Sequence, residues 1–359
     1  MNHTVCKINL SHPTTLDFHR SGWNFAINAL KPLHSDRGVY FDDFIENNFA
    51  WKHKKTGKRP DTVLEKMKKH GLYDLLATSE EKGITPYTQP WVGIIHNPPN
   101  MPTWFLYDSS PKTIFAKDIW KQSLDYCVGL FSLSEYYAQW LRTQTGKPVS
   151  TLIYPTEIPE LQFDFDKFIN NNQKKIVQVG WWLRKLHAIY QLPIGQNNSL
   201  KYEKIRLIPM YSPLAEQEIN TLMQVEKEIE KLQIDQEYYN NTTEIIHIPN
   251  DEYDELLSEN LVFMDLYDSS ANTAVVECIA RATPLLVNPL PAIVEYLGKD
   301  YPMYFNSLSE AAEKALDTSL IFDTHNYLKT CETRSKLRAE YFLNSFQQSE
   351  VYQLIEILK

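Results

Sequence analysis

Residues 261–297 read LVFMDLYDSSANTAVVECIARATPLLVNPLPAIVEYL, and the order of apolar and polar segments in them decides the fold. The apolar run at 261–265 predicts a buried strand. Ser269 and Ser270 are predicted to cap a helix over 271–282. A second apolar run follows and predicts the next strand. Strand, capped helix and strand predict a parallel sheet, in which ligands bind at the carboxyl ends of the strands beside helix N-termini.

The same alternation extends along the rest of the chain. In the second half, strands are predicted at 175–180, 205–209, 244–248, 284–288 and 302–305, with helices after Leu183 and over 214–233, 250–259 and 292–297. The first half is less regular, with strands predicted at 5–9, 91–95, 129–133 and 149–154 and helices at 23–30, 118–127 and 135–143. This pattern predicts an α/β protein with parallel sheets covered by helices on both faces.

The chain length and a polar interruption set the predicted domain boundaries. At 359 residues the chain exceeds the roughly 250–300 residues at which one core stops growing. We expect a first domain over 1–157, a linker over 158–174, a second domain over 175–330 and a C-terminal helix over 331–359. Two such domains would face a cleft, in which one holds a nucleotide and the other an acceptor.

Composition excludes some classes of partner and location. A formal net charge of -9 argues against nucleic acid as a ligand, because a phosphate backbone requires a basic face. The four cysteines, Cys6, Cys127, Cys278 and Cys331, form no close pair and are interpreted as reduced cytoplasmic thiols. We expect no signal peptide, the sequence has no run of roughly 20 apolar residues, and peripheral membrane contact stays open.

Glu277 is the single acid inside the apolar helix predicted over 271–282. A buried carboxylate costs free energy unless it has a partner. One interpretation is a salt bridge to Arg281, four residues on in the favourable order. The other is a ligand: Glu277 accepts two ribose hydroxyls, with Thr273 on the same helix face. Free backbone N–H groups in the first turn, near Asn272, suit a phosphate.

The second candidate site is GWWLRK, from Gly180 to Lys185. A glycine at the end of a strand permits close approach of the backbone to a ligand. Arg184 and Lys185 are adjacent cations at the beginning of the next predicted helix, where the helix dipole disfavours positive charge. A bound diphosphate offsets that cost and would be neutralised as it leaves. The alternative is that both are surface cations.

Two further candidates lie in the first half. His96 directly follows the strand at 91–95 and precedes a rigid Asn-Pro-Pro loop, so it is expected to face the cleft. The alternative is a histidine that stabilises a turn. Gly22 precedes a predicted helix and is a weaker candidate, because helix capping alone explains Ser21.

The motifs of other enzyme classes are missing from the sequence. It contains neither G-x-G-x-x-G nor the P-loop pattern. It also lacks zinc-ligand spacing and G-x-S-x-G. Asp164-Phe165-Asp166 is formally a D-x-D, but it falls in the predicted linker and is treated as chance. We therefore predict no essential metal and no cofactor.

At these residues the chain resembles GT-B glycosyltransferases, in particular the large glycogen-synthase-like group (family four). The likeness rests on Gly180 with Arg184 and Lys185, on the segment from Ser269 to Glu277, and on TPLLVN with the helix after it. HNPPNMPTWF and GLFSLSEYYAQWL resemble a subgroup of bacterial and large-virus polysaccharide glycosyltransferases. The resemblance implies two Rossmann-like domains facing a cleft, a nucleoside-diphosphate sugar as donor, and a glycan or glycolipid acceptor.

The resemblance also implies a role for each candidate residue. Glu277 would hold the ribose, and Arg184 and Lys185 the diphosphate. His96 would face the donor sugar, and backbone groups at Ile248 would meet the base. The catalytic set is Arg184, Lys185 and His96, and the donor-binding set is Gly22, Gly180, Ile248, Ser269, Ser270, Asn272, Thr273 and Glu277.

One position departs from the family pattern. The pattern is E-x7-E, and the position eight residues before Glu277 is Ser269. The missing acid normally faces the donor sugar, so the retaining route that the resemblance implies and an inverting route stay open. The candidates for a base in the inverting route are His96, Asp17 and His19.

We therefore expect a metal-independent, cytoplasmic glycosyltransferase of surface polysaccharide biosynthesis. A nucleotide-sugar epimerase on the same fold is the second interpretation. The third is a non-catalytic partner that binds a nucleotide sugar or a glycan, which Ser269 favours.

Overall fold

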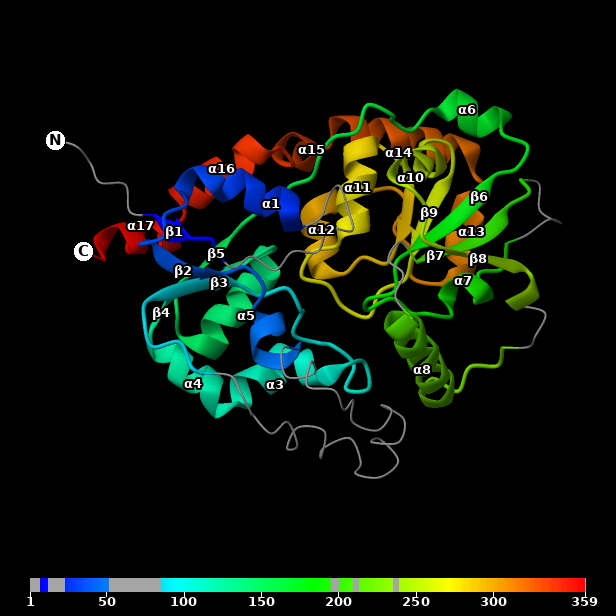
Figure 1. Cartoon of the computed structure of the whole chain (residues 1–359). Coiled ribbons are helices and arrows are strands. Elements are labelled where there is room, and N and C mark those ends of the chain that lie inside the picture. Colours follow the sequence, from blue (N-terminus) through cyan, green and yellow to red (C-terminus); the bar gives the residue numbers. More distant parts are fainter. Residues whose placement is uncertain are drawn as a thin grey trace. The chain divides into compact units, whose positions relative to one another are not determined.

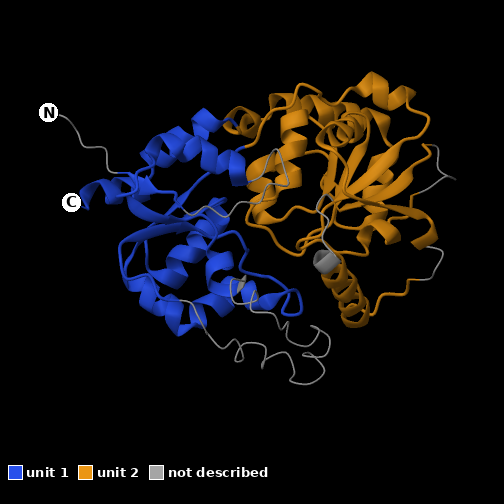
Figure 2. Ribbon diagram, in the orientation of Figure 1, with its two compact units in different colours: residues 1–17, 21–155, 338–359 blue, residues 18–20, 156–337 orange. Residues whose placement is uncertain are grey.

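The computed structural model describes residues 7–11, 23–51, 85–194, 200–208, 213–234 and 239–358. They belong to two compact units (Figures 1 and 2). Unit 1 comprises residues 1–17, 21–155 and 338–359, and unit 2 comprises 18–20 and 156–337. The candidates Asp17, His19 and Gly22, together with Cys6, lie outside the described residues.

Unit 1 is built on a five-stranded parallel sheet of order β1-β2-β3-β4-β5. Its strands are β1 (Ile8–Asn9), β2 (Val39–Asp42), β3 (Trp91–Ile94), β4 (Cys127–Ser132) and β5 (Val149–Thr151). Its helices are α1 (Trp23–Leu30), α3 (Pro111–Ala116), α4 (Asp118–Asp125), α5 (Glu135–Thr145), α16 (Ala339–Gln348) and α17 (Glu350–Ile357), with short turns at Lys31–Leu33, Asn47–Trp51 and Tyr107–Ser109. Strand β2 was not predicted, because its four residues give too short a pattern.

The C-terminal segment is not one helix, as the sequence predicted, but α15 (Glu332–Lys336), α16 and α17. Contacts with the first sheet explain why α16 and α17 return to unit 1. The ring of Phe346 stacks on Phe131 at 4.6 Å, and the backbone N–H of Val351 donates to Ser150 Oγ at 3.2 Å. Gly129 leaves room for this packing, since a β-carbon there would lie 2.7 Å from Val351.

Unit 2 contains a second five-stranded parallel sheet, of order β10-β9-β6-β7-β8. Its strands are β6 (Lys175–Val179), β7 (Glu203–Ile208), β8 (Thr242–Ile246), β9 (Leu261–Met264) and β10 (Leu285–Val287). Its helices are α6 (Phe165–Asn170), α7 (Ala188–Gln191), α8 (Pro213–Ile229), α10 (Asn250–Ser258), α11 (Thr273–Arg281), α12 (Pro291–Leu297), α13 (Leu308–Leu316), α14 (Thr318–Thr330) and α15. Every residue of β9 and β10 is buried, as in parallel strands covered on both faces.

Two predictions for this half need correction. The segment 302–305 is not a strand; Tyr304 forms only an isolated bridge to Val287. The segment 158–174 is not a free linker but part of unit 2, because Phe168 of α6 is buried and Phe163 N–H donates to the carbonyl of Arg281 at 2.9 Å. Its polar residues lie on the exposed face of α6 and in the turn after it, while the buried rings of Phe163 and Phe168 anchor the segment.

Asp164, the first residue of the chance D-x-D, caps α6 by accepting the Lys167 N–H at 3.0 Å. Cys127, Cys278 and Cys331 are free thiols. Within the described ranges, none of the helices combines the length and apolar character needed to cross a bilayer.

Candidate functional site

The turn after β6 carries the first group of predicted residues. Gly180 and Leu183 both have left-handed backbone conformations, with φ of 76° and 56°. A leucine in this conformation costs about 1–2 kcal/mol, so the surrounding contacts must hold it there. Arg184 pairs with Leu266, after β9, through an antiparallel bridge, and Lys185 N–H donates to the carbonyl of Asp265 at 2.8 Å. The turn therefore lies against the carboxyl end of β9.

Arg184 points into the protein and is 8% exposed. Its guanidinium donates to the carbonyls of Val179 at 3.1 Å and Trp182 at 2.7 Å, and to Asn272 Oδ1 at 3.3 Å. Burial lowers its pKa to about 10, while the nearby charge of Glu277 opposes this shift. Arg184 is thus a buried cation that joins the end of β6 to the beginning of α11.

Lys185 lies on the outer side of the same turn, with 44% of its side chain exposed. Its Nζ is 2.9 Å from Oδ1 of Asp265, the buried residue that directly follows β9. Burial raises the pKa of Asp265, and the Lys185 charge opposes that shift. The sequence did not single out Asp265 as a site residue, although its place after an apolar strand was a signal.

The beginning of α11 differs from the prediction. Asn272, and neither Ser269 nor Ser270, is the N-cap, since its Oδ1 accepts the N–H groups of Ala274 at 3.0 Å and Val275 at 3.3 Å. The helix begins at Thr273 because Asn272 has extended backbone angles. Ser269 and Ser270 lie in the preceding loop and are buried.

Ser269 replaces the acid of the family pattern, and its side chain is unusual. It is 4% exposed, and its hydroxyl has no hydrogen-bond partner among the described residues. Because a buried hydroxyl without a partner costs free energy, such a group is a candidate ligand contact.

Glu277 is 4% exposed and lies one turn after Thr273. Its Oε2 accepts the hydroxyl proton of Tyr253, from α10, at 2.5 Å. Arg281 is paired with Asp254, at 2.5 Å between Nη2 and Oδ1, and also donates to the Glu277 carbonyl at 3.3 Å. Arg281 therefore has a carboxylate partner of its own, and Glu277 is not a solvated helix edge. No local sequence pattern pointed to Tyr253 or Asp254.

Ile248 lies two residues after β8, which is the edge strand and is separated from β6 by β7. It is half-buried, and His247 before it has a left-handed backbone with φ of 58°. The residues that the structure brings together are Gly180, Arg184, Asn272 and Glu277, with Lys185 on the adjoining turn.

His96 belongs to unit 1 and follows β3, as predicted. Its Nε2 lies 2.7 Å from the indole nitrogen of Trp23 and 2.9 Å from the carbonyl oxygen of Asp43. Burial lowers its pKa to about 4, so the imidazole is neutral at pH 7. Its backbone N–H donates to Glu46 Oε1 at 2.8 Å, and the Asn97 N–H donates to the same oxygen at 2.6 Å. The turn-stabilising interpretation thus accounts for these contacts of His96.

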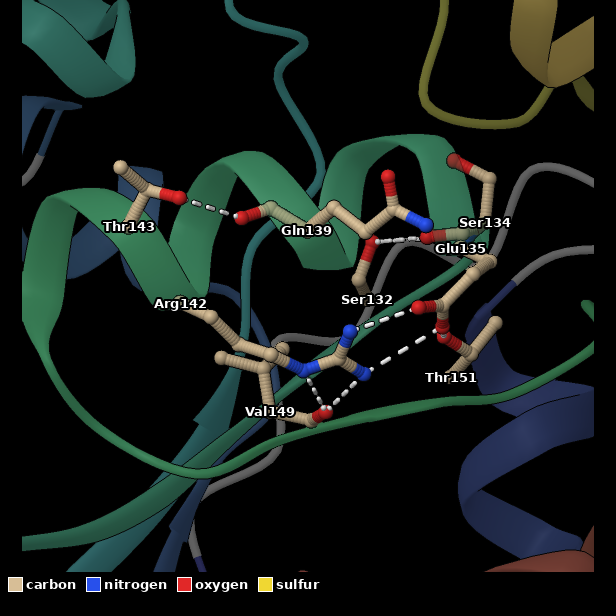
Figure 3. Close-up of polar contacts among 8 residues, drawn as sticks. All are labelled: Ser132, Ser134, Glu135, Gln139, Arg142, Thr143, Val149 and Thr151. Atoms are coloured by element: carbon tan, nitrogen blue, oxygen red, sulfur yellow. Dashed lines mark hydrogen bonds and ion pairs between the residues drawn. The ribbon is translucent and has the colours of Figure 1, made fainter.

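The carboxyl end of β4 carries another polar group that the sequence did not reveal (Figure 3). Glu135 forms an ion pair with Arg142 at 2.6 Å and accepts the hydroxyl of Thr151 at 2.7 Å. Arg142 also donates to the carbonyl of Val149. Ser134, at the N-cap of α5, is buried, and its hydroxyl lacks a hydrogen-bond partner in the described part of the chain.

Across the described ranges, no group of three or more His, Cys, Asp or Glu side chains could hold a metal ion.

Comparison with known proteins gives a result at the level of structure only. No protein-family model and no curated protein match the sequence. A trehalose-6-phosphate synthase, OtsA, matches with a TM-score of 0.55 and 14% identity over 94% of this chain and 76% of its own. An E. coli trehalose-6-phosphate structure with bound UDP-2-fluoro glucose matches with a TM-score of 0.53 and 13% identity over 94% and 77%.

A UDP-forming trehalose-phosphate synthase from Burkholderia xenovorans matches with a TM-score of 0.52 and 13% identity over 93% of this chain and 78% of its own. With a further synthase from Burkholderia multivorans, these neighbours are covered over 65–78% of their length. At sequence identities this low, the matches establish the fold and nothing further. With its two parallel five-stranded sheets, the chain has the GT-B fold of these glycosyltransferases.

Proposed function

We propose that this protein is a glycosyltransferase that moves a sugar from a nucleoside-diphosphate sugar to a glycan or glycolipid acceptor. The observation that carries the proposal is the contact of Arg184 with the N-cap of α11 and the ion pair of the adjacent Lys185 with Asp265, at the ends of the neighbouring strands β6 and β9 on a GT-B fold. Two fold neighbours support it, since one structure holds UDP-2-fluoro glucose and the other concerns enzymatic glycosyl transfer with retention.

The diphosphate would be held by the turn after β6 and the beginning of α11. The N-terminal end of the α11 dipole and the buried Arg184 place positive charge together, which favours an anion, although the Ala274 and Val275 N–H groups are bonded to Asn272 Oδ1. Lys185 is half exposed and would exchange its ion pair with Asp265 for a phosphate oxygen. Neutralising the charge of the leaving diphosphate in this way contributes a large part of the rate enhancement. We propose that no metal takes part.

The nucleoside would be held by Glu277 and by the end of β8. Tyr253 donates to Glu277 Oε2 and so orients the carboxylate that would accept the ribose hydroxyls. Backbone groups at Ile248 would meet the base. Ser269, Ser270 and Thr273 would contact the phosphates or the sugar, and the unpartnered hydroxyl of Ser269 supports this role.

His96 would contact the donor sugar as a neutral imidazole. With a pKa near 4 it is a weak base, which argues against His96 as the base of an inverting route. We propose retention, the route that the resemblance implies. Surface polysaccharide synthesis, a cytoplasmic location and peripheral membrane contact at a glycolipid remain part of the proposal.

Incubation with a panel of UDP, GDP, ADP and CMP sugars and a mixture of glycan acceptors tests the proposal. We expect one donor to release its nucleotide in an acceptor-dependent way, with Lys185→Ala about 100-fold slower. Lys201→Ala is the matched control, because this exposed lysine lies just before β7, at the amino ends of the strands of the same sheet and opposite the candidate site. An altered sugar still attached to nucleotide would favour an epimerase, and intact donor throughout would favour a binding partner.

A further inference from the structure

A buried carboxylate from a helix distant in sequence contacts the turn that carries the two cations. Glu226 belongs to α8 and is 1% exposed. Its Oε1 accepts the backbone N–H of Leu186 at 2.8 Å and the hydroxyl of Tyr267 at 2.7 Å. Its Oε2 accepts the backbone N–H of His187 at 2.9 Å and lies 2.5 Å from that residue's Nδ1. Both oxygens are therefore used to hold protein groups.

The segment after β9 holds the other side of the same turn. Tyr267 N–H donates to the carbonyl of Leu183 at 2.9 Å, and Lys185 N–H donates to that of Asp265 at 2.8 Å. Tyr267 also links this side to Glu226 through its hydroxyl. The backbone of Lys185 thus lies between bonds to the β9 segment and bonds to Glu226.

This double attachment matters because the turn is strained. Gly180 and Leu183 have positive φ values, and such conformations persist only where the surroundings over-determine them. His187 is itself fixed, since its Nε2 lies 3.2 Å from the hydroxyl of Tyr239. If the bonds to Glu226 were lost, the residues directly after Lys185 would be free to relax, and Lys185 with them.

We propose that Glu226 is a positioning residue, which holds the turn so that Lys185 Nζ meets the diphosphate of the donor. The inference rests on the proposed function, because it assumes that Lys185 binds a diphosphate. Glu226 is buried and would not touch the substrate. Its effect on turnover would therefore pass through Lys185.

A double-mutant cycle between Glu226→Gln and Lys185→Ala tests this, read in kcat, KM and the Kd of the nucleoside diphosphate found in the donor panel. Glutamine can accept only with Oε1, so one backbone N–H loses its acceptor. We expect kcat to fall about tenfold, with KM changed less than about threefold. In the Lys185→Ala background, the same substitution should cost less than about twofold.

Leu222→Ala is the matched structural control, because it opens a cavity beside the same helix and leaves the Glu226 side chain unchanged. It should lower the melting temperature but leave kcat near the wild-type value. Hydrogen exchange at Leu186 and His187 adds a readout independent of activity. We expect faster exchange there in Glu226→Gln, with the amides of β6 unchanged.

Equal losses in both backgrounds, a loss reproduced by Leu222→Ala, or unchanged exchange at Leu186 and His187 would each overturn the positioning role. A Glu226→Gln variant with wild-type kcat and Kd would refute this role alone and leave the proposed function standing. A wild-type protein that binds no nucleoside diphosphate would overturn both.

Discussion

The two units hold the segment after a central strand in the same way, but the hydrogen bonds of the glutamate that holds it are complete only in unit 2. In each, a buried glutamate accepts two consecutive backbone N–H groups of the segment that follows a central strand. In unit 2, Glu226 holds Leu186 and His187, and both of its oxygens have further protein donors. In unit 1, Glu46 holds His96 and Asn97 through Oε1 alone, and Oε2 has no hydrogen-bond partner among the described residues.

The difference shows in the electrostatics. Burial raises the pKa of Glu46 to about 7, and its backbone bonds oppose this only in part. A carboxylate with one oxygen satisfied is therefore close to protonation at neutral pH. The turn of unit 2 is built to be rigid, whereas the turn of unit 1 is coupled to pH.

The largest difference between the two units is expected when each carboxylate is removed and the free energy of unfolding is measured. Glu226→Ala leaves two buried backbone N–H groups, the Tyr267 hydroxyl and His187 without their acceptor. We expect it to lower the free energy of unfolding by about 3–5 kcal/mol. Glu46→Ala also removes an unfavourable buried charge and should cost only about 1–2 kcal/mol at pH 7. Urea unfolding of both variants measures this, and a larger cost for Glu46→Ala would contradict it.

The pH dependence of stability should identify Glu46. Its folded pKa of about 7 lies above its ordinary value of 4.5, so it stabilises the fold at low pH. That contribution is lost as the pH rises from about 4.5 to about 7, and amounts to about 3 kcal/mol. Glu46→Gln should remove this decline. The measurement is urea unfolding at several pH values between 4 and 8, and a variant whose pH profile parallels that of the wild type would refute the assignment.

His96 should act in the opposite direction. Its pKa is lowered from 6.5 to about 4, so its contribution is present above pH 6.5 and is lost as the pH falls toward 4. Because the side chain is partly exposed, we expect about 2 kcal/mol. In the wild type, the dependences of Glu46 and His96 oppose each other between pH 4.5 and 6.5. In the same unfolding series, His96→Asn should therefore lose stability as the pH rises, and a flat profile would argue against this opposition.

The smallest effect is expected at Tyr267. Tyr267→Phe removes one of the two donors to Glu226 Oε1 but keeps the ring and both backbone bonds of the turn. We expect a loss of about 1 kcal/mol in the free energy of unfolding. The double variant with Glu226→Gln measures coupling, and strictly additive losses would show that the hydroxyl does not act through Glu226.

The α/β fold was predictable because it depends on short-range patterns. The apolar runs of β6, β9 and β10 and the helices between them follow directly from the sequence. The positions of the segment 158–174 and of the C-terminal helices were not predictable. They depend on contacts with distant residues, such as Phe163 with Arg281 and Phe346 with Phe131.

The candidate site was predictable to the same degree. Gly180, Arg184 and Glu277 each have a local signal, and the structure brings the first two to the cap of α11. The residues that hold these side chains in place have no local signal in the sequence. Glu226 is 39 residues from His187 in sequence, and Tyr253 is 24 from Glu277. No local periodicity reports such pairs.

The central claim is that the end of β6 and the beginning of α11 form a diphosphate site. Calorimetric titration with UDP, GDP, ADP and CMP tests it most directly, in the wild type, Lys185→Ala and Lys201→Ala. We predict that the wild type binds one nucleoside diphosphate, that Lys185→Ala binds it at least about tenfold more weakly, and that Lys201→Ala binds it like the wild type. Equal affinity in all three proteins, or no binding to any of the four nucleotides, would contradict the account.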